Sequence, residues 1–237
     1  MPAINGNLRN AVIVAGHSVV VDFNRVEEDS GWALLDFQRG EPKKYIEHVR
    51  RAVEEASADP AALILFSGGQ TRAAAGPRSE AQSYWGVAEH FQWFDLQQVR
   101  GRATTEEFAR DSYENLLLGI CRFREYTGNW PAAVTLVSWA FKRARFDLHR
   151  TAIGWPADRF RYIGANDPDD LPQALVSEQN AIRAYTGDPY SSGPAFRKKR
   201  MDRNPFRRQH GYAVCCPELT HLLGWAGPRQ FDGHLPW

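Results

Sequence analysis

The sequence predicts an α/β protein with a Rossmann-like, doubly wound, mainly parallel sheet, helices on both faces and a C-terminal extension. Short apolar runs that end in small or polar residues alternate with segments whose apolar residues recur at helical spacing. This alternation is typical of parallel sheets that are covered on both faces. With 43% hydrophobic residues and 29 Lys and Arg against 28 Asp and Glu, the chain is globular rather than disordered.

The first part of the chain predicts a strand, a helix and a second strand. Residues 11–15 form an apolar run that ends at Gly16-His17, and residues 62–66 form another that ends at Ser67. Between them, residues 45–56 carry apolar side chains at helical spacing. Residues 18–40 have no clear period, so we expect a loop there that covers another part of the molecule.

Helix starts follow from pairs of capping residues. Ser79 with Gln82 predicts a helix start, and Thr104 with Glu107 predicts a second helix, which extends to Gly128. The remaining elements are two strands at residues 133–137 and 160–163 and two helices. The first of these helices carries an inward face of Phe141, Ala144, Leu148 and Ala152, and the second spans residues 172–185.

The carboxyl ends of parallel strands lie at one edge of a sheet, where ligands bind at the switch point in strand order. We therefore expect Gly16-His17, Ser67-Gly68-Gly69, Ser138-Trp139 and residues 164–167 to lie along one edge. We assign residues 1–166 to the Rossmann-like domain. Residues 167–237 form a helix and a basic, Pro- and Arg-rich extension that packs on the same core.

Composition narrows the functional classes. No apolar run approaches the roughly 20 residues of a membrane helix, and no signal peptide is visible, so we expect a cytoplasmic protein without membrane contact. Cys121, Cys215 and Cys216 support neither a disulfide framework nor a multi-cysteine zinc site. The sequence leaves metal dependence and oligomeric state open.

Basic residues are concentrated near the C-terminus. Between Phe196 and His210 there are seven Lys and Arg against the single Asp202, although the whole chain is nearly neutral. Such a segment either packs on an acidic face of its own domain or contacts phosphate or nucleic acid. We favour the first interpretation, and general nucleic-acid binding does not fit the near-zero net charge.

Two turns could serve either structure or ligand binding. Ser67-Gly68-Gly69-Gln70-Thr71 either offers backbone N–H groups to an anion or forms a structural turn, and it lacks the dinucleotide and P-loop fingerprints. At the next helix start, Ser79 precedes Glu80. Glu80 would repel an anion, so it is either a base or hydroxyl-binding group or a carboxylate that stabilises the helix dipole.

Polar residues on the two following helices, and His17, could likewise serve either structure or ligand binding. Asp111, Ser112 and Asn115 interrupt an apolar stripe, and Asn115 either pins the Ser67-Gly68-Gly69 loop or contacts ligand. A stripe of three residues, Lys142, Arg145 and His149, suits phosphate or carboxylate, or is a solvated face. His17, at a strand end, is either an acid/base group or a core residue.

The succession of these motifs resembles the domain-of-unknown-function family that contains YdcF, SanA and ElyC. The resemblance spans residues 10–166 and rests on Gly16, Ser67-Gly68-Gly69, Ser79-Glu80-Ala81, residues 112–115 and Ser138 with residues 142–145. SanA- and ElyC-like members have a membrane anchor, and this chain looks closest to soluble fungal members. It departs from the family pattern at His17, at residues 110–113 and at residues 139–141, where a His-containing segment is common.

The resemblance implies a ligand site at the carboxyl edge of the sheet and S-adenosylmethionine as a possible cofactor. The residues that match the family's ligand contacts are Gly16, Ser67, Gly68, Gly69, Ser79, Glu80, Asn115 and Arg145; Ser138 and Lys142 are further candidate contacts. The candidate catalytic residues are Glu80, His17 and Asp111. We expect a small-molecule enzyme that acts on or with an S-adenosyl or nucleotide-like anionic ligand; the alternative is a non-catalytic regulatory module that binds such a ligand.

Overall fold

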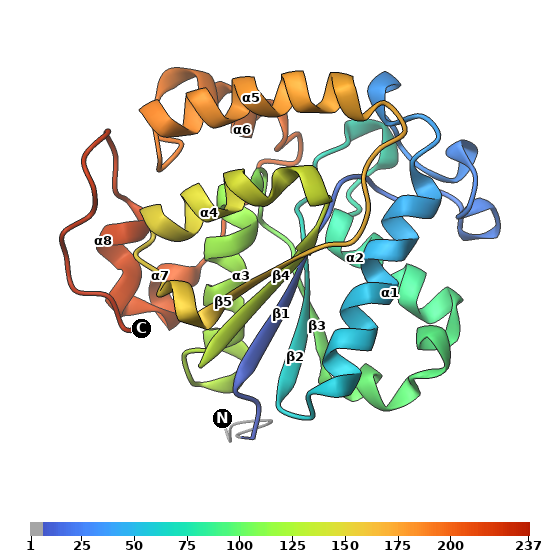
Figure 1. The fold of residues 1–237 in the computed structure, drawn as a ribbon, viewed down its shortest axis with the longest axis horizontal. Coiled ribbons are helices and arrows are strands. Elements are labelled where there is room, and N and C mark those ends of the chain that lie inside the picture. The colour runs from blue at the N-terminus through green and yellow to red at the C-terminus, as the bar shows by residue number, and fades with distance from the viewer. Residues whose placement is uncertain (1–6) are drawn as a thin grey trace.

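The computed structural model describes residues 7–237 and shows an α/β fold around one five-stranded, all-parallel sheet (Figure 1). The strand order is β3-β2-β1-β4-β5. The strands are β1 (Asn10–Ala15), β2 (Ala62–Ser67), β3 (Ala103–Glu106), β4 (Ala133–Ser138) and β5 (Phe160–Gly164). The chain order reverses between β1 and β4, as in Rossmann-like sheets, so the predicted fold class is confirmed.

Helices cover both faces of the sheet and its carboxyl edge. The helices are α1 (Pro42–Ala58), α2 (Glu80–His90), α3 (Ser112–Thr127), α4 (Arg143–Ala152), α5 (Leu171–Gly187), α6 (Pro194–Asp202), α7 (Tyr212–Cys215) and α8 (Thr220–Leu223). In Figure 1, α1 and α2 lie on one side of the sheet and α3 and α4 on the other, while α5 and α6 extend across the end where the strands finish. Among residues 7–237, no helix is long and apolar enough to cross a bilayer.

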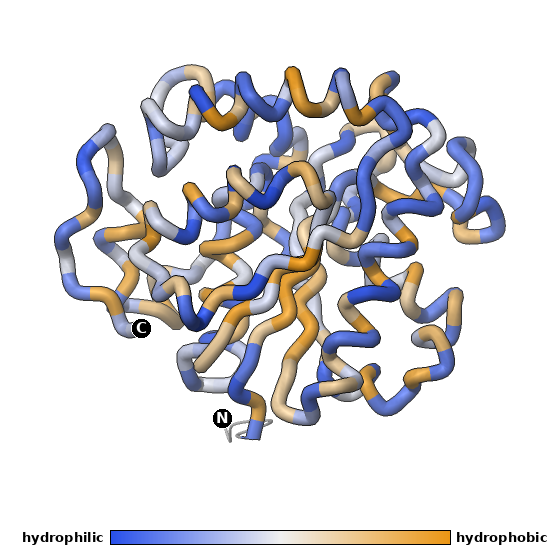
Figure 2. The backbone as a smooth tube through the Cα atoms, viewed as in Figure 1, coloured by the Kyte–Doolittle hydropathy of each residue, from blue (hydrophilic) through white to orange (hydrophobic). Residues whose placement is uncertain are grey.

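Alternate residues of the strands contribute to two cores. Val12 and Val14 of β1 pack with the residues of α1 and α2, whereas Ile13 packs with those of α3 and α4. These apolar strands form the centre of the molecule in Figure 2. Tyr185 and Tyr212 of the C-terminal extension belong to the same core as Ile13, so the extension is packed on the sheet domain.

The predicted helix start at Thr104 is wrong. Thr104 lies in β3, which pairs in parallel with β2, and α3 begins at Ser112 with Asp111 as its N-cap. The strand is only four residues long and polar, so it has no apolar run, and Thr104 with Glu107 imitates a capping box. The helix ends before Gly128 as predicted, because Gly128 adopts the left-handed conformation that closes a helix.

The predicted inward face of α4 is wrong in part. The buried residues are Phe146, His149 and Ala152, whereas Ala144 is exposed. A 3₁₀ turn at Ala140–Lys142 precedes the helix and changes the rotation of the side chains relative to a single continuous helix. His149 is therefore a core residue and not part of a solvated basic stripe.

Candidate functional site

The candidate site is a cavity of about 130 Å³ at the carboxyl ends of the central strands. It lies beside the switch point between β1 and β4, the position that open parallel sheets use for ligands. Six parts of the chain meet there: the end of β1, the loop of residues 35–38, the loop after β2 that carries Arg72, the start of α3, the start of α4, and α6 with the residue that follows it. The lining residues are Ala15, Gly16, His17, Leu35, Phe37, Gln38, Arg72, Asp111, Ser112, Asn115, Lys142, Arg145, Phe146, Lys199 and Arg203.

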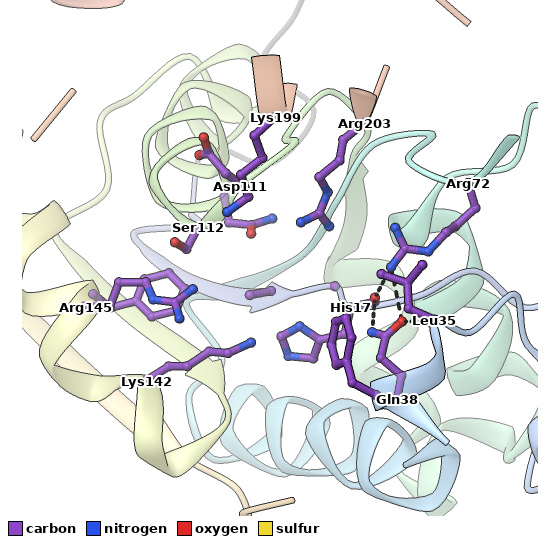
Figure 3. A pocket seen from close by; sticks show the side chains of 15 residues that line it. His17, Leu35, Gln38, Arg72, Asp111, Ser112, Lys142, Arg145, Lys199 and Arg203 are labelled. Atoms are coloured by element: carbon purple, nitrogen blue, oxygen red, sulfur yellow. Dashed lines mark hydrogen bonds between the residues drawn. The ribbon is translucent and has the colours of Figure 1, made fainter. Parts of the chain in front are cut away.

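Among the described residues that line this cavity, five are cationic and Asp111 is the single carboxylate. Figure 3 shows Arg145 of α4 and Lys142, which directly precedes α4, entering from one side, with Lys199 and Arg203 approaching from the α6 side and Arg72 opposite α4. Their positions in the sequence range from 72 to 203, so only the fold brings them together. Such a cluster is electrostatically costly unless an anion or a carboxylate neutralises it.

Carboxylates neutralise two of the five cations. Arg145 forms a two-pronged ion pair with Glu178 of α5, and Arg203 donates to Glu80 at 3.2 Å. The Nε of Arg203 is nevertheless buried without a hydrogen-bond partner among residues 7–237. An anion in the cavity would be the natural partner for such a donor.

The other three cations have no carboxylate partner within residues 7–237. Arg72 donates to the carbonyl of His17 and to Oε1 of Gln38, both at 3.2 Å, which are neutral acceptors. In the same described part of the chain, the side chains of Lys142 and Lys199 form neither a hydrogen bond nor an ion pair. The cavity therefore has an excess of positive charge.

Burial, together with the neighbouring cations, lowers the pKa of both lysines. Burial, with Arg145 nearby, lowers the pKa of Lys142 to about 7. Burial also lowers the pKa of Lys199 to about 8, although Asp111 opposes that shift. Both ammonium groups thus exchange protons near neutral pH, and a bound anion would stabilise their charged forms.

Asp111 has a structural role. Its Oδ1 accepts from the backbone N–H of Glu114 at the start of α3, and its Oδ2 accepts from Nε of Arg200 at 2.6 Å. Burial alone would raise the pKa of Asp111, but Arg200 outweighs it and the pKa falls to about 2. This carboxylate is ionised and paired, which does not favour the acid or base role expected from the sequence.

His17 lies at the cavity, as the sequence suggested, and is held by its backbone. Its carbonyl accepts from both Gln38 and Arg72, and its ring lies 5.8 Å from that of Trp139. Burial, with Lys142 and His48 nearby, lowers the pKa of His17 well below its usual value. His17 therefore presents a neutral imidazole, with Nε2 3.4 Å from the hydroxyl of Ser138.

Glu80 lies behind the floor of the cavity rather than in its lining. It is 2% exposed and accepts from the hydroxyl of Thr71 and from Arg203. A Cβ built on Gly16 would lie 2.7 Å from Cβ of Glu80, so the glycine is what lets the end of β1 pass over it. The structure thus favours Glu80 as the charge partner of Arg203 over Glu80 as a base that touches the ligand.

Ser67-Gly68-Gly69 does not present its amides to the cavity. The N–H of Gly68 donates to the carbonyl of Glu106, and that of Gly69 donates to Ala109. The hydroxyl of Ser67 donates to Glu106, and the side-chain amide of Asn115 donates to the carbonyl and hydroxyl of Ser67. The N–H groups of Gly68 and Gly69 are therefore already paired, and Asn115 pins this turn, although Asn115 also lines the cavity.

The two remaining candidate serines also lie outside the cavity lining. Ser79 caps α2, with its hydroxyl accepting from the N–H of Gln82, as its sequence position predicted. Ser138 is fully buried at the end of β4 behind His17. Six of the twelve candidate site residues line the cavity. They are Gly16, His17, Asp111, Asn115, Lys142 and Arg145.

Half-buried Ser112 and fully buried His149 form a pair that resembles a nucleophile with its base. The hydroxyl of Ser112, which lines the cavity, lies 2.8 Å from Nε2 of His149. Nδ1 of His149 is buried without a partner in residues 7–237, so the ring proton favours Nε2 and is donated to Ser112. Ser112 then donates to Tyr185 at 3.4 Å, and its oxygen is not activated for attack.

Six lining residues were not among the candidates predicted from the sequence: Arg72, Lys199, Arg203 and the loop residues Leu35, Phe37 and Gln38. The concentration of basic residues after Phe196 was the available signal for two of them. That segment does pack on acidic residues of its own domain, through the pairs Arg200–Asp111 and Arg208–Glu107. Lys199 and Arg203, four positions apart, enter the cavity from the same segment.

Comparison with known proteins identifies a relative. No family model and no solved structure matches the chain. Uncharacterized protein YOR238W of Saccharomyces cerevisiae is 31% identical over an alignment of 238 residues. The alignment covers 71% of this chain and 78% of the yeast protein. The chain belongs to the same protein family as this yeast relative.

Proposed function

We propose that this protein binds a small anionic ligand, with a phosphate group as the preferred anion, in the cavity at the carboxyl edge of the sheet. The observation that carries the proposal is the convergence of five cationic side chains, three of them without a carboxylate partner in residues 7–237. A phosphate group offers several oxygens to the guanidinium and ammonium donors and would neutralise their charge. We propose a YdcF-like assignment on the sequence motifs alone.

The residues fit S-adenosylmethionine poorly. Its sulfonium and ammonium groups outnumber its single carboxylate, so it would add net positive charge beside Lys142 and Lys199. The cavity, about 130 Å³, is also smaller than the roughly 300–1,000 Å³ of pockets that enclose whole cofactors. Of the two ligands expected from the sequence, the nucleotide-like one agrees better with the positive charge of the cavity. Its phosphate group would lie inside the cavity and the rest of the molecule would lie at the mouth.

Catalysis on such a ligand is a second candidate function, favoured by Lys142. Its ammonium group faces the anion site with a pKa of about 7, the range in which a group can give and take a proton at neutral pH. The acid/base role expected for Asp111 does not fit its ion pair, and Glu80 does not line the cavity. Lys142 is therefore the residue to test, with His17 as a neutral hydrogen-bonding neighbour. If catalysis occurs, release of phosphate from a phosphate monoester should require Lys142.

Binding is tested by thermal unfolding of the full chain with inorganic phosphate and with S-adenosylmethionine. A ligand at about 100 times its Kd adds about 2.7 kcal/mol to the free energy of unfolding. For a chain of this length the midpoint then rises by roughly 5–10 °C. We expect this rise with phosphate and a smaller one with S-adenosylmethionine.

Three lysine variants locate the binding site. A charged hydrogen bond contributes about 1.5–3 kcal/mol, so Lys142→Met and Lys199→Met should each weaken phosphate binding by at least about ten-fold. The matched control is Lys198→Met, because that side chain is exposed and paired with Asp202. Equal phosphate affinity in all three variants would place the anion elsewhere and refute the proposal.

A further inference from the structure

We infer that the anionic ligand carries a planar aromatic ring, which stacks on Phe37 at the mouth of the cavity. This inference rests on the proposed function and adds the chemical class of the ligand: an aryl or nucleobase compound that bears a phosphate group. The loop of residues 35–38 supplies the evidence. It contributes three residues to the cavity lining, and two of them are exposed and apolar.

Phe37 is 77% exposed and Leu35 is 44% exposed, yet both line the same cavity as the five cations. An exposed phenylalanine ring loses the free energy that burial would provide. Isolated exposed apolar residues are common on protein surfaces, but these two adjoin a charged cavity that already calls for a ligand. Apolar and cationic surfaces side by side match a ligand with an apolar part and an anionic part.

The loop is fixed rather than loosely placed. Gln38, next to Phe37, is 5% exposed and joins three parts of the site. Its Nε2 donates to the carbonyl of His17 at 2.8 Å, and its Oε1 accepts from the backbone N–H of Leu35 and from Arg72. Arg72 binds the same carbonyl of His17. The residues on either side of Phe37 are thus attached to the floor of the anion site, so the backbone position of this ring is set before a ligand binds.

Cavity size directs the rest of the ligand toward this ring. A volume of about 130 Å³ suits an anionic group but not a whole nucleotide-sized molecule. The remainder must extend through the mouth, where Leu35 and Phe37 lie. Stacking fits the ring better than an aliphatic chain does, because two ring faces pack in an offset arrangement with favourable electrostatics.

The experiment measures how tightly the full chain binds methyl phosphate and phenyl phosphate by titration calorimetry. The two ligands have the same anionic group and differ in the ring. The variants are Phe37→Ala, which removes the ring, and Phe37→Tyr, which keeps it. Val214→Ala is the control, because Val214 is 87% exposed and does not line the cavity.

We expect the unmodified chain to bind phenyl phosphate about ten-fold more tightly than methyl phosphate. Phe37→Ala should abolish this difference by weakening phenyl phosphate binding about ten-fold, while Phe37→Tyr and Val214→Ala should retain it. Equal binding of the two ligands, or a ring preference that survives Phe37→Ala, overturns the ring inference alone. Failure of both ligands to bind overturns the proposed function and this inference with it.

Discussion

The ion pair between Arg200 and Asp111 allows a quantitative test of how the C-terminal extension is attached to the sheet domain. Nε of Arg200 donates to Oδ2 of Asp111 at 2.6 Å and lies 3.3 Å from Oε1 of Glu114. The Asp111 side chain is fully buried and that of Arg200 is 15% exposed. Replacing Arg200 with methionine would leave the carboxylate buried without its main counter-charge, while methionine fills much of the space.

The magnitude follows from burial and from the pKa of Asp111. Removing one partner of a buried ion pair costs about 3–5 kcal/mol. In the intact pair, the pKa of Asp111 is about 2, against an ordinary value of 3.8. That difference alone corresponds to about 2 kcal/mol of folding free energy. We therefore expect Arg200→Met to lower the free energy of unfolding by about 3–5 kcal/mol at pH 7.

The loss should depend on pH with a defined sign. The pKa of Asp111 is lowered in the folded state, so its stabilisation is present above about pH 4 and is lost as the pH falls toward 2. In the variant, burial without Arg200 raises that pKa, so protonation removes the penalty at low pH. The stability difference between the two proteins should therefore be less than half as large at pH 3 as at pH 7.

Urea unfolding at pH 7 and pH 3, followed by circular dichroism, measures both quantities. Lys198→Met is the control, since exposed helical pairs such as Lys198–Asp202 contribute only a few tenths of a kcal/mol. Adding Asp111→Asn to Arg200→Met should recover part of the lost stability, because the unpaired charge is then absent. A loss below about 1 kcal/mol at pH 7, or an equal loss at both pH values, would refute the reasoning.

Two further predictions concern the cavity. Binding of inorganic sulfate, whose charge is constant, should weaken as the pH rises from about 6 to about 9. The reason is that Lys142 and Lys199, with pKa values of about 7 and 8, lose protons over this range. Calorimetry in which the sulfate affinity stays constant with pH would contradict these pKa values. Gly16→Ala should lower the free energy of unfolding by about 1–3 kcal/mol, because its Cβ would lie 2.7 Å from Cβ of Glu80. Gly101→Ala, with nothing within 4 Å of its Cβ, is the matched urea-unfolding control and should change stability little.

Elements with a strong local signal could be predicted, and elements set by tertiary pairing could not. The buried runs at residues 11–15 and 62–66 are strands because both faces of the central sheet are covered, which makes every residue apolar. The short edge strand β3 lacks that constraint, and hydrogen bonds to β2 determine its conformation. The face of α4 was misjudged for a similar reason, since the 3₁₀ turn at Ala140–Lys142 has no distinctive pattern in the sequence.

The residues of the candidate site also divide into those that could be predicted from the sequence and those that depend on tertiary contacts. Topology places Gly16, His17, Lys142 and Arg145 at one edge once the strands are known, so their meeting could be expected from the sequence. Arg72, Lys199 and Arg203 depend on how a loop and the C-terminal extension fold back over the sheet. The roles of Ser67, Gly68 and Gly69 were open because the sequence does not show which acceptors their donor groups meet.

Packing of the basic segment on its own domain does not exclude a role in anion binding, although the sequence presented these as alternatives. Arg200 and Arg208 pair with Asp111 and Glu107, and these contacts anchor the segment. Lys199, adjacent to Arg200 on α6, makes no ion pair in the described part of the chain and lines the cavity. Because consecutive helix residues point about 100° apart, one side chain can hold the helix against the domain while the next faces the ligand. Anchoring by Arg200 thus places the charge of Lys199 in the anion site, and loss of the Arg200 pair should weaken phosphate binding even though Arg200 does not line the cavity.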